Sequence, residues 1–357
     1  MTTDRVSTDR SGTHRSGAAA PRRAAVLAID GGNSKTDVAL IGANGAILGV
    51  ARGGNSNHQG IGIDGMVAML SGLVRSAAIE AGLPADEPVA QHTSACLAGA
   101  DLPSEEAYLN RLVASLGWSQ TSRVQNDTFA VLRAGLDDSA GPHWGIGVVC
   151  GAGINCVGVA ADGRTTRFLS LGELSGDWGG GGELGRQALW WAVRAEDGRG
   201  PETGLRRAVP AHFGLERVED VVTGIYLGKI PYQDLHGLVP VLFAVAGTGD
   251  QVAGDLLTRQ AEEIFLMVEV AARRLGLTDR PALAGQPLPV VLGGSLMTAR
   301  DPLLTGAITD RVLARIPDAQ IRIVSVPPVA GAALLGLDHV GAPPSAAARL
   351  RDGLRTD

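Results

Sequence analysis

The sequence predicts an α/β protein made of two similar halves with a cleft between them. Short apolar runs alternate with helical apolar patterns from residue 25 onward. Two glycine-rich hairpins with the same layout open the two halves, one over 25–48 and the other over 145–164. The repeated layout indicates an ancient duplication, and chance similarity between two glycine-rich hairpins is the alternative.

Composition narrows the class of protein. The 357 residues suffice for two ordinary domains, and the 45% hydrophobic and 19% charged content is typical of a soluble globular protein. The net charge of −6 argues against nucleic acid, which normally needs a basic face. No apolar run reaches the roughly 20 residues that span a bilayer, so we expect no membrane partner. Three cysteines without a CxxC pair predict neither disulfides nor zinc, and favour a cytoplasmic setting.

The first half has a strand–turn–strand beginning followed by alternating helices and strands. The strands are expected over 25–30, 36–42, 46–51 and 90–97, with a short strand ending at Asn126. The helices are expected over 64–82, over 104–116 and from about 128, with Asp64 as the first N-cap. A polar segment with glycine and proline, 137–142, then marks a domain boundary.

The second half begins with the second hairpin and is otherwise largely helical. Helices are expected near 182–197, 203–213, 231–246 and 251–276. A strand over 289–292 leads through Gly293, Gly294 and Ser295 into a further helix. A last strand, over 322–326, precedes the small-residue helix VAGAALLGL, and a tail or loosely attached helix ends the chain.

The tip of the first hairpin, DGGNSKTD, has the residue types of a phosphate and metal site. Its glycine pair lets backbone N–H groups approach an anion closely. Ser34 and Thr36 add hydroxyls and Lys35 adds a positive charge. Asp30 would repel phosphate unless a divalent metal lay between them, directly or through water. The alternative is a plain hairpin whose polar residues are solvated.

Two further segments suit phosphoryl transfer. Gly151, Ala152 and Gly153 offer a second set of backbone donors, so two facing hairpins would grip a triphosphate, unless this turn is merely structural. Asp127 ends a strand and begins a helix, where a carboxylate can accept a proton from a hydroxyl that attacks phosphorus. An ordinary helix N-cap is the alternative role for Asp127.

Two loops have groups that suit a sugar. The polar loop GGNSNHQG places Asn57 and His58 where amide and imidazole groups would bind hydroxyls, and a solvated loop is the alternative. The stretch ELSGDWGGGGELG has four consecutive glycines, which predict a close-approach ligand loop opening a helix rather than a flexible linker. Trp178 in this stretch would stack on a sugar face or fill the space that another substituent would occupy.

These segments together resemble the BadF/BadG/BcrA/BcrD ATPase family, which includes N-acetylglucosamine kinases and belongs to the sugar kinase, actin and heat-shock ATPase superfamily. IDGGNSKTDVAL resembles its first phosphate motif, VVCGAGINCVGV its second and VVLGGSLMTA its adenosine motif. VAGAALLGL resembles the helix that returns to the first domain. The resemblance implies a two-domain actin-like ATPase fold, ribonuclease H-like, with duplicated mixed sheets and a nucleotide cleft between the domains.

The resemblance also implies domain bounds and residue roles. The expected parts are a disordered tail over 1–24, an N-terminal domain over 25–138 with the sugar loop and catalytic Asp, a C-terminal nucleotide-binding domain over 139–327, the returning helix over 328–340 and a tail over 341–357. Asp127 would be catalytic and Asp30 would lie near magnesium. The implied ATP-binding residues are Gly31, Gly32, Asn33, Ser34, Lys35, Gly151, Ala152, Gly153, Gly237, Gly293, Gly294 and Ser295. The implied sugar-binding residues are Asn57, His58, Asp127, Ile154, Asn155, Gly172, Glu173 and Asp177.

The predicted function is that of an ATP-dependent amino-sugar kinase using ATP and Mg²⁺. The expected acceptor is the 6-hydroxyl of N-acetylglucosamine, followed by glucosamine or N-acetylmuramic acid, and a homodimer is expected by analogy. Ala152 and Ile154 stand where the family commonly carries hydroxyls, and Leu171 where animal N-acetylglucosamine kinases have a tryptophan.

Three alternatives stay open. An ATPase activator of acyl-CoA dehydratases or reductases would bind an iron–sulfur cluster through paired cysteines, and Cys96, Cys150 and Cys156 show no such pairing. A sugar-sensing regulator would carry a DNA-binding helix pair, for which a 24-residue tail is too short. A phosphatase or phosphotransferase acting on polyphosphate would need a basic channel, which the net charge of −6 does not favour.

Overall fold

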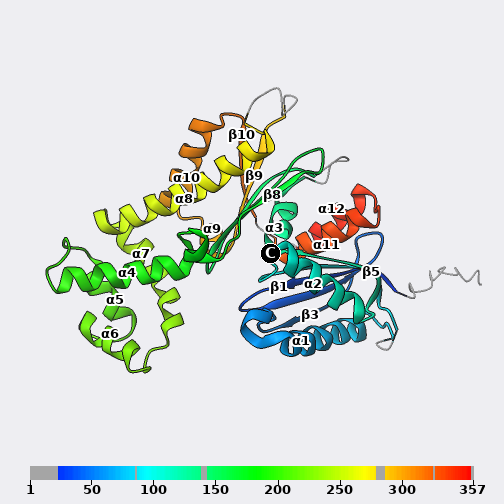
Figure 1. Ribbon diagram of the computed structural model, residues 1–357, viewed down its shortest axis with the longest axis horizontal. Helices are drawn as coiled ribbons and strands as arrows, with labels where there is room; N and C mark the ends of the chain where they lie inside the picture. Colours follow the sequence, from blue (N-terminus) through cyan, green and yellow to red (C-terminus); the bar gives the residue numbers. More distant parts are fainter. Residues whose placement is uncertain (1–22, 85–86, 138–142, 279–285, 325, 355–357) are drawn as a thin grey trace, which may run out of the picture.

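The computed structural model describes residues 23–84, 87–137, 143–278, 286–324 and 326–354. Most of the predicted tail over 1–24 and of the predicted boundary over 137–142 therefore lies outside the described residues. The described chain forms two mixed five-stranded sheets surrounded by helices (Figure 1). The expected α/β architecture with duplicated mixed sheets is confirmed.

The first sheet, sheet A, has the strand order β3-β2-β1-β4-β5. Its strands are β1 (Ala24–Gly31), β2 (Thr36–Ile41), β3 (Ile47–Gly53), β4 (Ala90–Leu97) and β5 (Ser119–Asn126). The first three strands are antiparallel neighbours, whereas β1, β4 and β5 run parallel. All eight residues of β1 are buried, because helices cover both faces of the sheet. These helices are α1 (His58–Glu80) and α2 (Pro103–Ser115) on one face, and α11 (Pro328–His339) and α12 (Pro344–Leu354) on the other.

The second sheet, sheet B, repeats this arrangement in the order β8-β7-β6-β9-β10, with the same parallel and antiparallel pairings. Its strands are β6 (Gly145–Cys150), β7 (Ile154–Val159), β8 (Thr165–Arg167), β9 (Leu288–Gly293) and β10 (Ala319–Ile323). Its helices are α4 (Gly180–Glu196), α5 (Leu205–His212), α6 (Val218–Tyr226), α7 (Leu238–Gly247), α8 (Gln251–Leu275), α9 (Ser295–Thr298) and α10 (Pro302–Arg315). Two 3₁₀ turns, η1 (Gly172–Ser175) and η2 (Tyr232–Gly237), complete this half.

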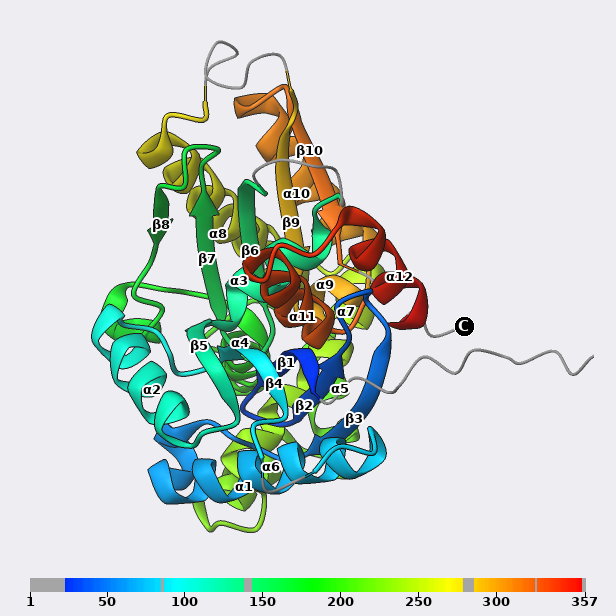
Figure 2. The ribbon, with the colours of Figure 1, turned by 90° about the vertical axis from the view of Figure 1, so that its right-hand side faces the viewer.

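The two halves exchange one helix each. Helix α3 (Asp127–Gly135) follows β5 of sheet A but packs against sheet B, while α11 follows β10 of sheet B and packs against sheet A. Figure 2 shows both helices between the two sheets. They touch closely, since a Cβ at Gly331 would lie 1.8 Å from the carbonyl oxygen of Ala130. The small residues of VAGAALLGL are therefore required by helix packing.

Several elements differ from the expectation. Helix α1 begins at His58 rather than near Asp64, because Asn57 caps it and Gly62, at φ 74°, absorbs a kink inside it. Strand β10 begins at Ala319, earlier than the expected 322, because an edge strand carries polar side chains such as Gln320 that an apolar run does not reveal. The short elements β8 and α6 were not anticipated, and the expected helix over 231–246 is η2 followed by α7.

The end of the chain is packed more firmly than expected. Within the predicted tail over 341–357, helix α12 buries Ala346, Ala347 and Leu350 against α11 and sheet A. Arg351 of this helix donates hydrogen bonds to the carbonyls of Ala134 and Leu136 at the end of α3. The segment is thus part of the core that holds α3.

Within the described ranges, one helix, α1, is long and apolar enough to cross a membrane by length and composition alone. The bent pair Tyr232–Gly247 and Gln251–Leu275, at 114°, passes the same test jointly. Core helices of soluble proteins commonly pass it as well, and α1 packs Met66 and Leu70 against sheet A. The absence of a membrane partner stays a prediction.

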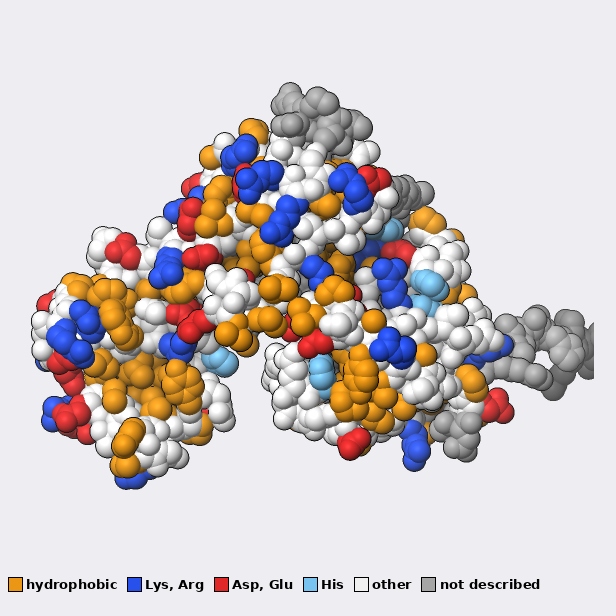
Figure 3. Space-filling model, viewed as in Figure 1, with side chains coloured by type: hydrophobic (Ala, Val, Ile, Leu, Met, Phe, Trp, Pro, Cys, Tyr) orange, Lys and Arg blue, Asp and Glu red, His pale blue; other side chains and the backbone are white. Residues whose placement is uncertain are grey.

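The molecule is deeply hollowed between its two halves. Figure 3 shows a wide notch that separates the N-terminal half, with α1, from the part formed by α4, α5 and α6. Helices α3 and α11 lie above the N-terminal half in Figure 1, where the two halves meet. A ligand in the notch would therefore contact both halves.

Candidate active site

The start of helix α3 bears on the two roles that the sequence leaves open for Asp127, which are proton acceptor and helix N-cap. The N-cap is Asn126, whose side-chain oxygen accepts a hydrogen bond from the Thr128 N–H at 3.0 Å. Asp127 is the first helical residue, and the Thr128 hydroxyl lies 3.5 Å from its Oδ1. Because a neighbour caps the helix, the Asp127 carboxylate is not needed as a cap. Burial raises its pKa to about 6, which suits a group that takes up a proton near neutral pH.

Asp30 is a buried carboxylate with no ion-pair partner among the described residues, although the charge of Lys35 acts on it from nearby. It lies near the end of β1, 7% exposed, and no described residue donates a hydrogen bond or forms an ion pair with its side chain. The nearby cations are engaged elsewhere, since Lys35 and Arg52 pair with Asp37 at 3.3 and 2.5 Å. Burial, followed by the negative charges of Asp127 and Asp37, raises the pKa of Asp30 to about 7. Such a site favours binding of a cation.

A magnesium ion fits the chemistry of Asp30. Mg²⁺ binds proteins through one or two carboxylates and takes its other oxygen ligands from phosphates and water. Among the residues that the structure describes, no group of three or more His, Cys, Asp or Glu side chains forms a metal cage. Asp30 is therefore suited to a metal that arrives with a nucleotide rather than to a resident ion.

The first hairpin tip is a tight turn that rests on the sugar loop. The Gly32 N–H donates to the carbonyl of Lys35 at 2.9 Å and closes the turn. Gly31 has no room for a side chain, because a Cβ there would lie 2.6 Å from Leu97 and 2.7 Å from the Ser56 hydroxyl. Thr36 is buried with its hydroxyl 2.7 Å from that of Ser56, so its role is structural. The exposed tip residues are Asn33, Ser34 and Lys35.

The predicted sugar loop joins this hairpin directly. The Asn57 side-chain oxygen caps α1 by accepting from the Gln59 N–H at 2.9 Å, and its amide nitrogen donates to Asn33 at 2.6 Å. Asn57 is thus buried and engaged at both ends of its amide. His58 is the first residue of α1 and is half-buried. The structure brings the predicted sugar loop and the predicted phosphate loop together.

The glycine run over 179–182 packs closely against the second hairpin. As expected, it opens a helix, α4. Its N–H groups, however, donate to the second hairpin, from Gly181 to the Gly151 carbonyl at 2.7 Å and from Gly182 to the Ala152 carbonyl at 2.9 Å. A Cβ at Gly180 would lie 2.5 Å from the backbone of Gly153. The close approach that requires glycine here is to the second hairpin, and contact of this run with a ligand stays a prediction.

The remaining predicted sugar-binding residues lie in two places. Two are on the second strand of the second hairpin, and three are in a loop that follows it. Asn155 on β7 donates to the side-chain oxygen of Asn126 at 3.1 Å, whereas Ile154 is buried in the core beside sheet B. The loop carrying Gly172, Glu173 and Asp177 forms η1 and the turn after it. All three residues have partners within the protein. The Glu173 carboxylate forms an ion pair with Arg186, and Asp177 Oδ2 accepts a hydrogen bond from the Ser175 hydroxyl. The Gly172 carbonyl accepts a hydrogen bond from the Asp177 N–H.

Trp178 does not offer a free face to a sugar on the side where Arg259 lies. The Arg259 guanidinium is 4.1 Å from the centre of its ring, and the ring also packs against the core beside sheet B. This cation–π contact holds the tryptophan as part of the wall. The expected stacking of Trp178 on a sugar is replaced on that side by stacking with arginine.

The predicted adenosine residues lie where β9 meets α9. A Cβ at Gly293 would lie 2.4 Å from Val131 of α3, and one at Gly294, whose φ is 91°, would lie 2.3 Å from the Cys150 carbonyl. Ser295 begins the short helix α9, and Gly237 ends η2 beside His212. Gly293 is thus required by packing on α3, and Gly294 by its positive φ and by the close approach of β6. Their contact with ATP stays a prediction.

Three charged residues near α3 were not predicted. The Asp101 carboxylate accepts from the Asn126 amide at 3.0 Å, and Glu106 accepts from the Asn126 backbone N–H at 2.9 Å. Arg167 pairs with Glu106 at 2.7 Å. Burial and then the charge of Asp127 raise the pKa of Asp101 to about 6. No local sequence signal distinguishes these residues, because each is a single charge at the end of an ordinary element.

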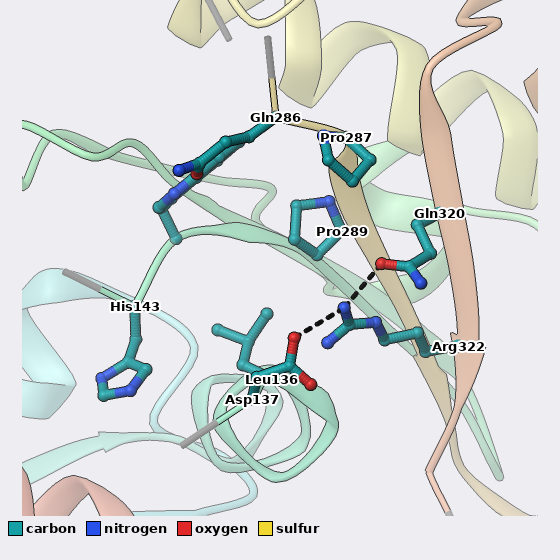
Figure 4. Close-up of a pocket in the computed structure, with 9 residues that line it drawn as sticks. Leu136, Asp137, His143, Gln286, Pro287, Pro289, Gln320 and Arg322 are labelled. Atoms are coloured by element: carbon teal, nitrogen blue, oxygen red, sulfur yellow. Dashed lines mark hydrogen bonds and ion pairs between the residues drawn. The ribbon is translucent and has the colours of Figure 1, made fainter. Parts of the chain in front are cut away.

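A well-defined cavity lies at the other end of α3 (Figure 4). It has a volume of about 390 Å³ and is lined in part by Leu136, Asp137, His143, Gln320 and Arg322. Arg322 donates to Asp137 at 2.9 Å and to Gln320 at 2.6 Å, as the dashed lines show. It also donates to the Gly135 carbonyl at 3.2 Å, so this end of α3 is anchored by cations. The cavity is separate from Asp127 at the start of the helix.

Two sheets of identical order, exchanged helices and a cleft between the halves define the class of two-domain, actin-like sugar kinase folds. The chain belongs to the BadF/BadG/BcrA/BcrD ATPase family, whose profile matches residues 27–336. This confirms the family that the motifs indicated.

Three similar proteins illustrate the membership. The chain is 27% identical over 319 residues to an N-acetyl-D-glucosamine kinase of Dictyostelium discoideum, covering 87% of this chain and 97% of that one. It is 27% identical over 257 residues to an N-acetylmuramic acid/N-acetylglucosamine kinase of Clostridium acetobutylicum, covering 71% and 81%. Among solved structures, a putative N-acetylglucosamine kinase of Chromobacterium violaceum superposes with a TM-score of 0.65 at 24% identity, covering 89% and 100%.

Proposed function

We propose that this protein is an ATP-dependent amino-sugar kinase that phosphorylates the 6-hydroxyl of N-acetylglucosamine, with glucosamine and N-acetylmuramic acid as the next acceptors. The observation that carries the proposal is Asp127 at the first turn of α3. Its carboxylate is not used as a cap, and its pKa is raised to about 6 by burial. The names of the two curated relatives support an amino-sugar acceptor.

The residues suggest a division of labour in phosphoryl transfer. Asp127 accepts or orients the proton of the attacking sugar hydroxyl, a role that needs an ionised carboxylate at the working pH. The exposed hairpin tip with Asn33, Ser34 and Lys35 offers backbone N–H groups, a hydroxyl and a cation to phosphate. Asp30 would hold Mg²⁺, which neutralises phosphate charge when it is bound.

The notch shown in Figure 3 lies between the two halves, so ATP and a sugar bound there would contact both halves. Water competes with a sugar as the acceptor, so a site completed by approach of the halves limits wasteful ATP hydrolysis. Gly151 and Gly153 on the second hairpin would then face the phosphates from the other half, with Gly293, Gly294 and Ser295 nearer the nucleoside. Asn57, His58 and Asp177 would bind the sugar.

The iron–sulfur activator is less consistent with the thiols. Cys96, Cys150 and Cys156 are all buried free thiols, so none is placed at a surface where two subunits would share a cluster. We further propose that the protein is a cytoplasmic homodimer, which light scattering on the purified protein tests.

The proposed function is tested by ADP release from ATP and Mg²⁺ across a sugar panel. The panel holds N-acetylglucosamine, glucosamine, N-acetylmuramic acid, N-acetylmannosamine and glucose. We expect turnover that depends on an amino sugar and is highest with N-acetylglucosamine, and a phosphorylated 6-position in the product by NMR. ATP hydrolysis that is indifferent to every sugar would contradict the kinase and favour the activator.

A further inference from the structure

Arg167 reaches from one half of the molecule to the other. It is the last residue of β8, at the edge of sheet B. Its guanidinium pairs with Glu106 of α2 at 2.7 Å and donates to the backbone carbonyls of Ala100 and Asp101, all in the N-terminal half. The Arg167 and Glu106 side chains are 20% and 21% exposed, so water screens this contact only partly. The contact fixes the segment where β4 leads into α2.

The residues that Arg167 holds are those that hold Asn126. Glu106 Oε1, the atom paired with Arg167, also accepts from the Asn126 backbone N–H at 2.9 Å. Asp101, whose carbonyl Arg167 binds, accepts from the Asn126 side-chain amide at 3.0 Å. Both hydrogen bonds that Asn126 donates therefore end on residues that Arg167 contacts, at the same atom of Glu106 and at a different group of Asp101.

Asn126 in turn sets the first turn of α3. Its side-chain oxygen caps the helix through the Thr128 N–H, directly beside Asp127. The same oxygen accepts from Asn155 of β7 at 3.1 Å, and Asn155 accepts from Ser170 at 2.5 Å. Two strands of sheet B thus contact the start of α3. Strand β7 does so directly through Asn155, and strand β8 does so through Arg167 and Glu106 of α2. Figure 2 shows the start of β7 and the end of β8 on the side that faces β5 and α2.

These contacts depend on how the halves sit relative to each other. Arg167 and Asn155 belong to sheet B, whereas Ala100, Asp101, Glu106 and Asn126 belong to the half built on sheet A. A small rotation of one half would separate atoms that now lie about 3 Å apart, because hydrogen bonds weaken steeply with distance and angle. Without the contacts from Arg167 and Asn155, Asn126 would keep only its hydrogen bonds to Asp101, Glu106 and Thr128 in its own half.

We propose that Arg167 is a positioning residue that couples the approach of the two halves to the placement of Asp127 by holding Glu106 and the Asp101 carbonyl. The inference rests on the proposed kinase function for its kinetic consequence. Arg167 touches no reacting group. A displacement of about 1 Å in such a group can cost about 10²-fold in rate, which sets the scale of the effect.

The variants are Arg167→Gln, Arg167→Lys and the matched control Arg164→Gln. Arg164 lies in the turn before the same strand, is 61% exposed and pairs with Asp162. In Arg167→Gln we expect kcat to fall by about 10- to 100-fold with the KM for ATP changed less than about 2-fold. Arg167→Lys keeps the charge but not the fork of donors, so it should recover part of kcat. Arg164→Gln should match the wild type.

Hydrogen–deuterium exchange supplies a readout that needs no activity. In Arg167→Gln the amides of Asn126 and Thr128 should exchange faster, while those of β6 and β9 keep wild-type protection. Equal protection at Thr128 in all three variants would overturn the proposal, as would a loss of protection spread evenly over sheet B, which indicates a merely structural role. If the wild type phosphorylates no sugar, the proposed function fails, and the exchange result still decides whether Arg167 controls the start of α3.

Discussion

Replacing Asp127 with Asn separates catalysis from stability. The change removes the charge and keeps the shape of the side chain. Because Asn126 provides the N-cap of α3, the helix should begin at the same residue in the variant. An effect on turnover would then come from the lost carboxylate and not from a lost cap.

The structure gives the sign and size of the stability effect. Burial raises the pKa of Asp127 from 3.8 to about 6, so the folded state holds this proton more tightly than the unfolded chain. The free energy of unfolding therefore falls as pH rises from about 4 to about 6 and stays lower above that range. The full shift corresponds to roughly 3 kcal/mol, and partial exposure reduces it. Asn escapes this penalty, so Asp127→Asn should be about 1–3 kcal/mol more stable than the wild type at pH 7.5 and little different at pH 3.

Turnover should change in the opposite direction. Loss of a general base costs typically about 10²- to 10⁴-fold, so kcat for N-acetylglucosamine should fall by at least about 10²-fold. The kcat of the wild type should decline below about pH 6, where Asp127 becomes protonated. The assays are coupled ADP release and urea unfolding at pH 7.5 and pH 3.

The matched control is Asp162→Asn, which alters an exposed carboxylate paired with Arg164 in the β7–β8 turn. This control should keep wild-type turnover. Asp127→Asn that retains more than a tenth of wild-type kcat would refute the role of the carboxylate. A variant that loses both activity and stability at pH 7.5 would refute the argument that its charge is buried at a cost.

Three further predictions concern the metal, the helix contact and the thiols. Asp30→Asn should raise the Mg²⁺ concentration needed for half-maximal ADP release while leaving the KM for the sugar within about 2-fold, and an unchanged Mg²⁺ titration would remove Asp30 from the metal site. Gly331→Ala should destabilise the protein by about 1–3 kcal/mol or more in urea unfolding, since its Cβ would meet the Ala130 carbonyl oxygen at 1.8 Å. The control Gly254→Ala, in helix α8 with open space around it, should instead stabilise by about 0.5–1 kcal/mol, and equal effects would contradict the packing argument. The three buried cysteines should react with a thiol reagent only after unfolding, and fast labelling of the native protein would reopen the activator alternative.

Local patterns in the sequence predicted much of the framework. The two hairpins, the strand–helix junction at Asn126 and the small-residue helix were all read from spacing that hydrogen bonding and burial impose within about ten residues. The family followed from four motifs in order, and its profile matches 27–336. Where local cues conflicted, as at the start of α1, the cap at Asn57 replaced the expected one at Asp64 because a kink at Gly62 lets two helical segments join.

The partners of individual side chains could not be read in this way. The glycines over 179–182 were expected to approach a ligand, but the structure places Gly180 against Gly153 of the second hairpin. Trp178 was expected at a sugar and is covered on one side by Arg259, far away in the sequence. At both places another segment of the chain makes a contact that the local sequence does not reveal.

The sequence by itself determined the fold class, the duplicated hairpins, the family and Asp127 as the candidate base, because these depend on patterns within short segments. Only the tertiary structure decided that Asn126 caps α3, that Lys35 and Arg52 form ion pairs with Asp37 rather than with Asp30, and that Arg167 crosses between the halves. The physical reason is that ion pairs and pKa values depend on burial and on distances through space. Residues far apart in the chain set those distances, and local spacing does not record them.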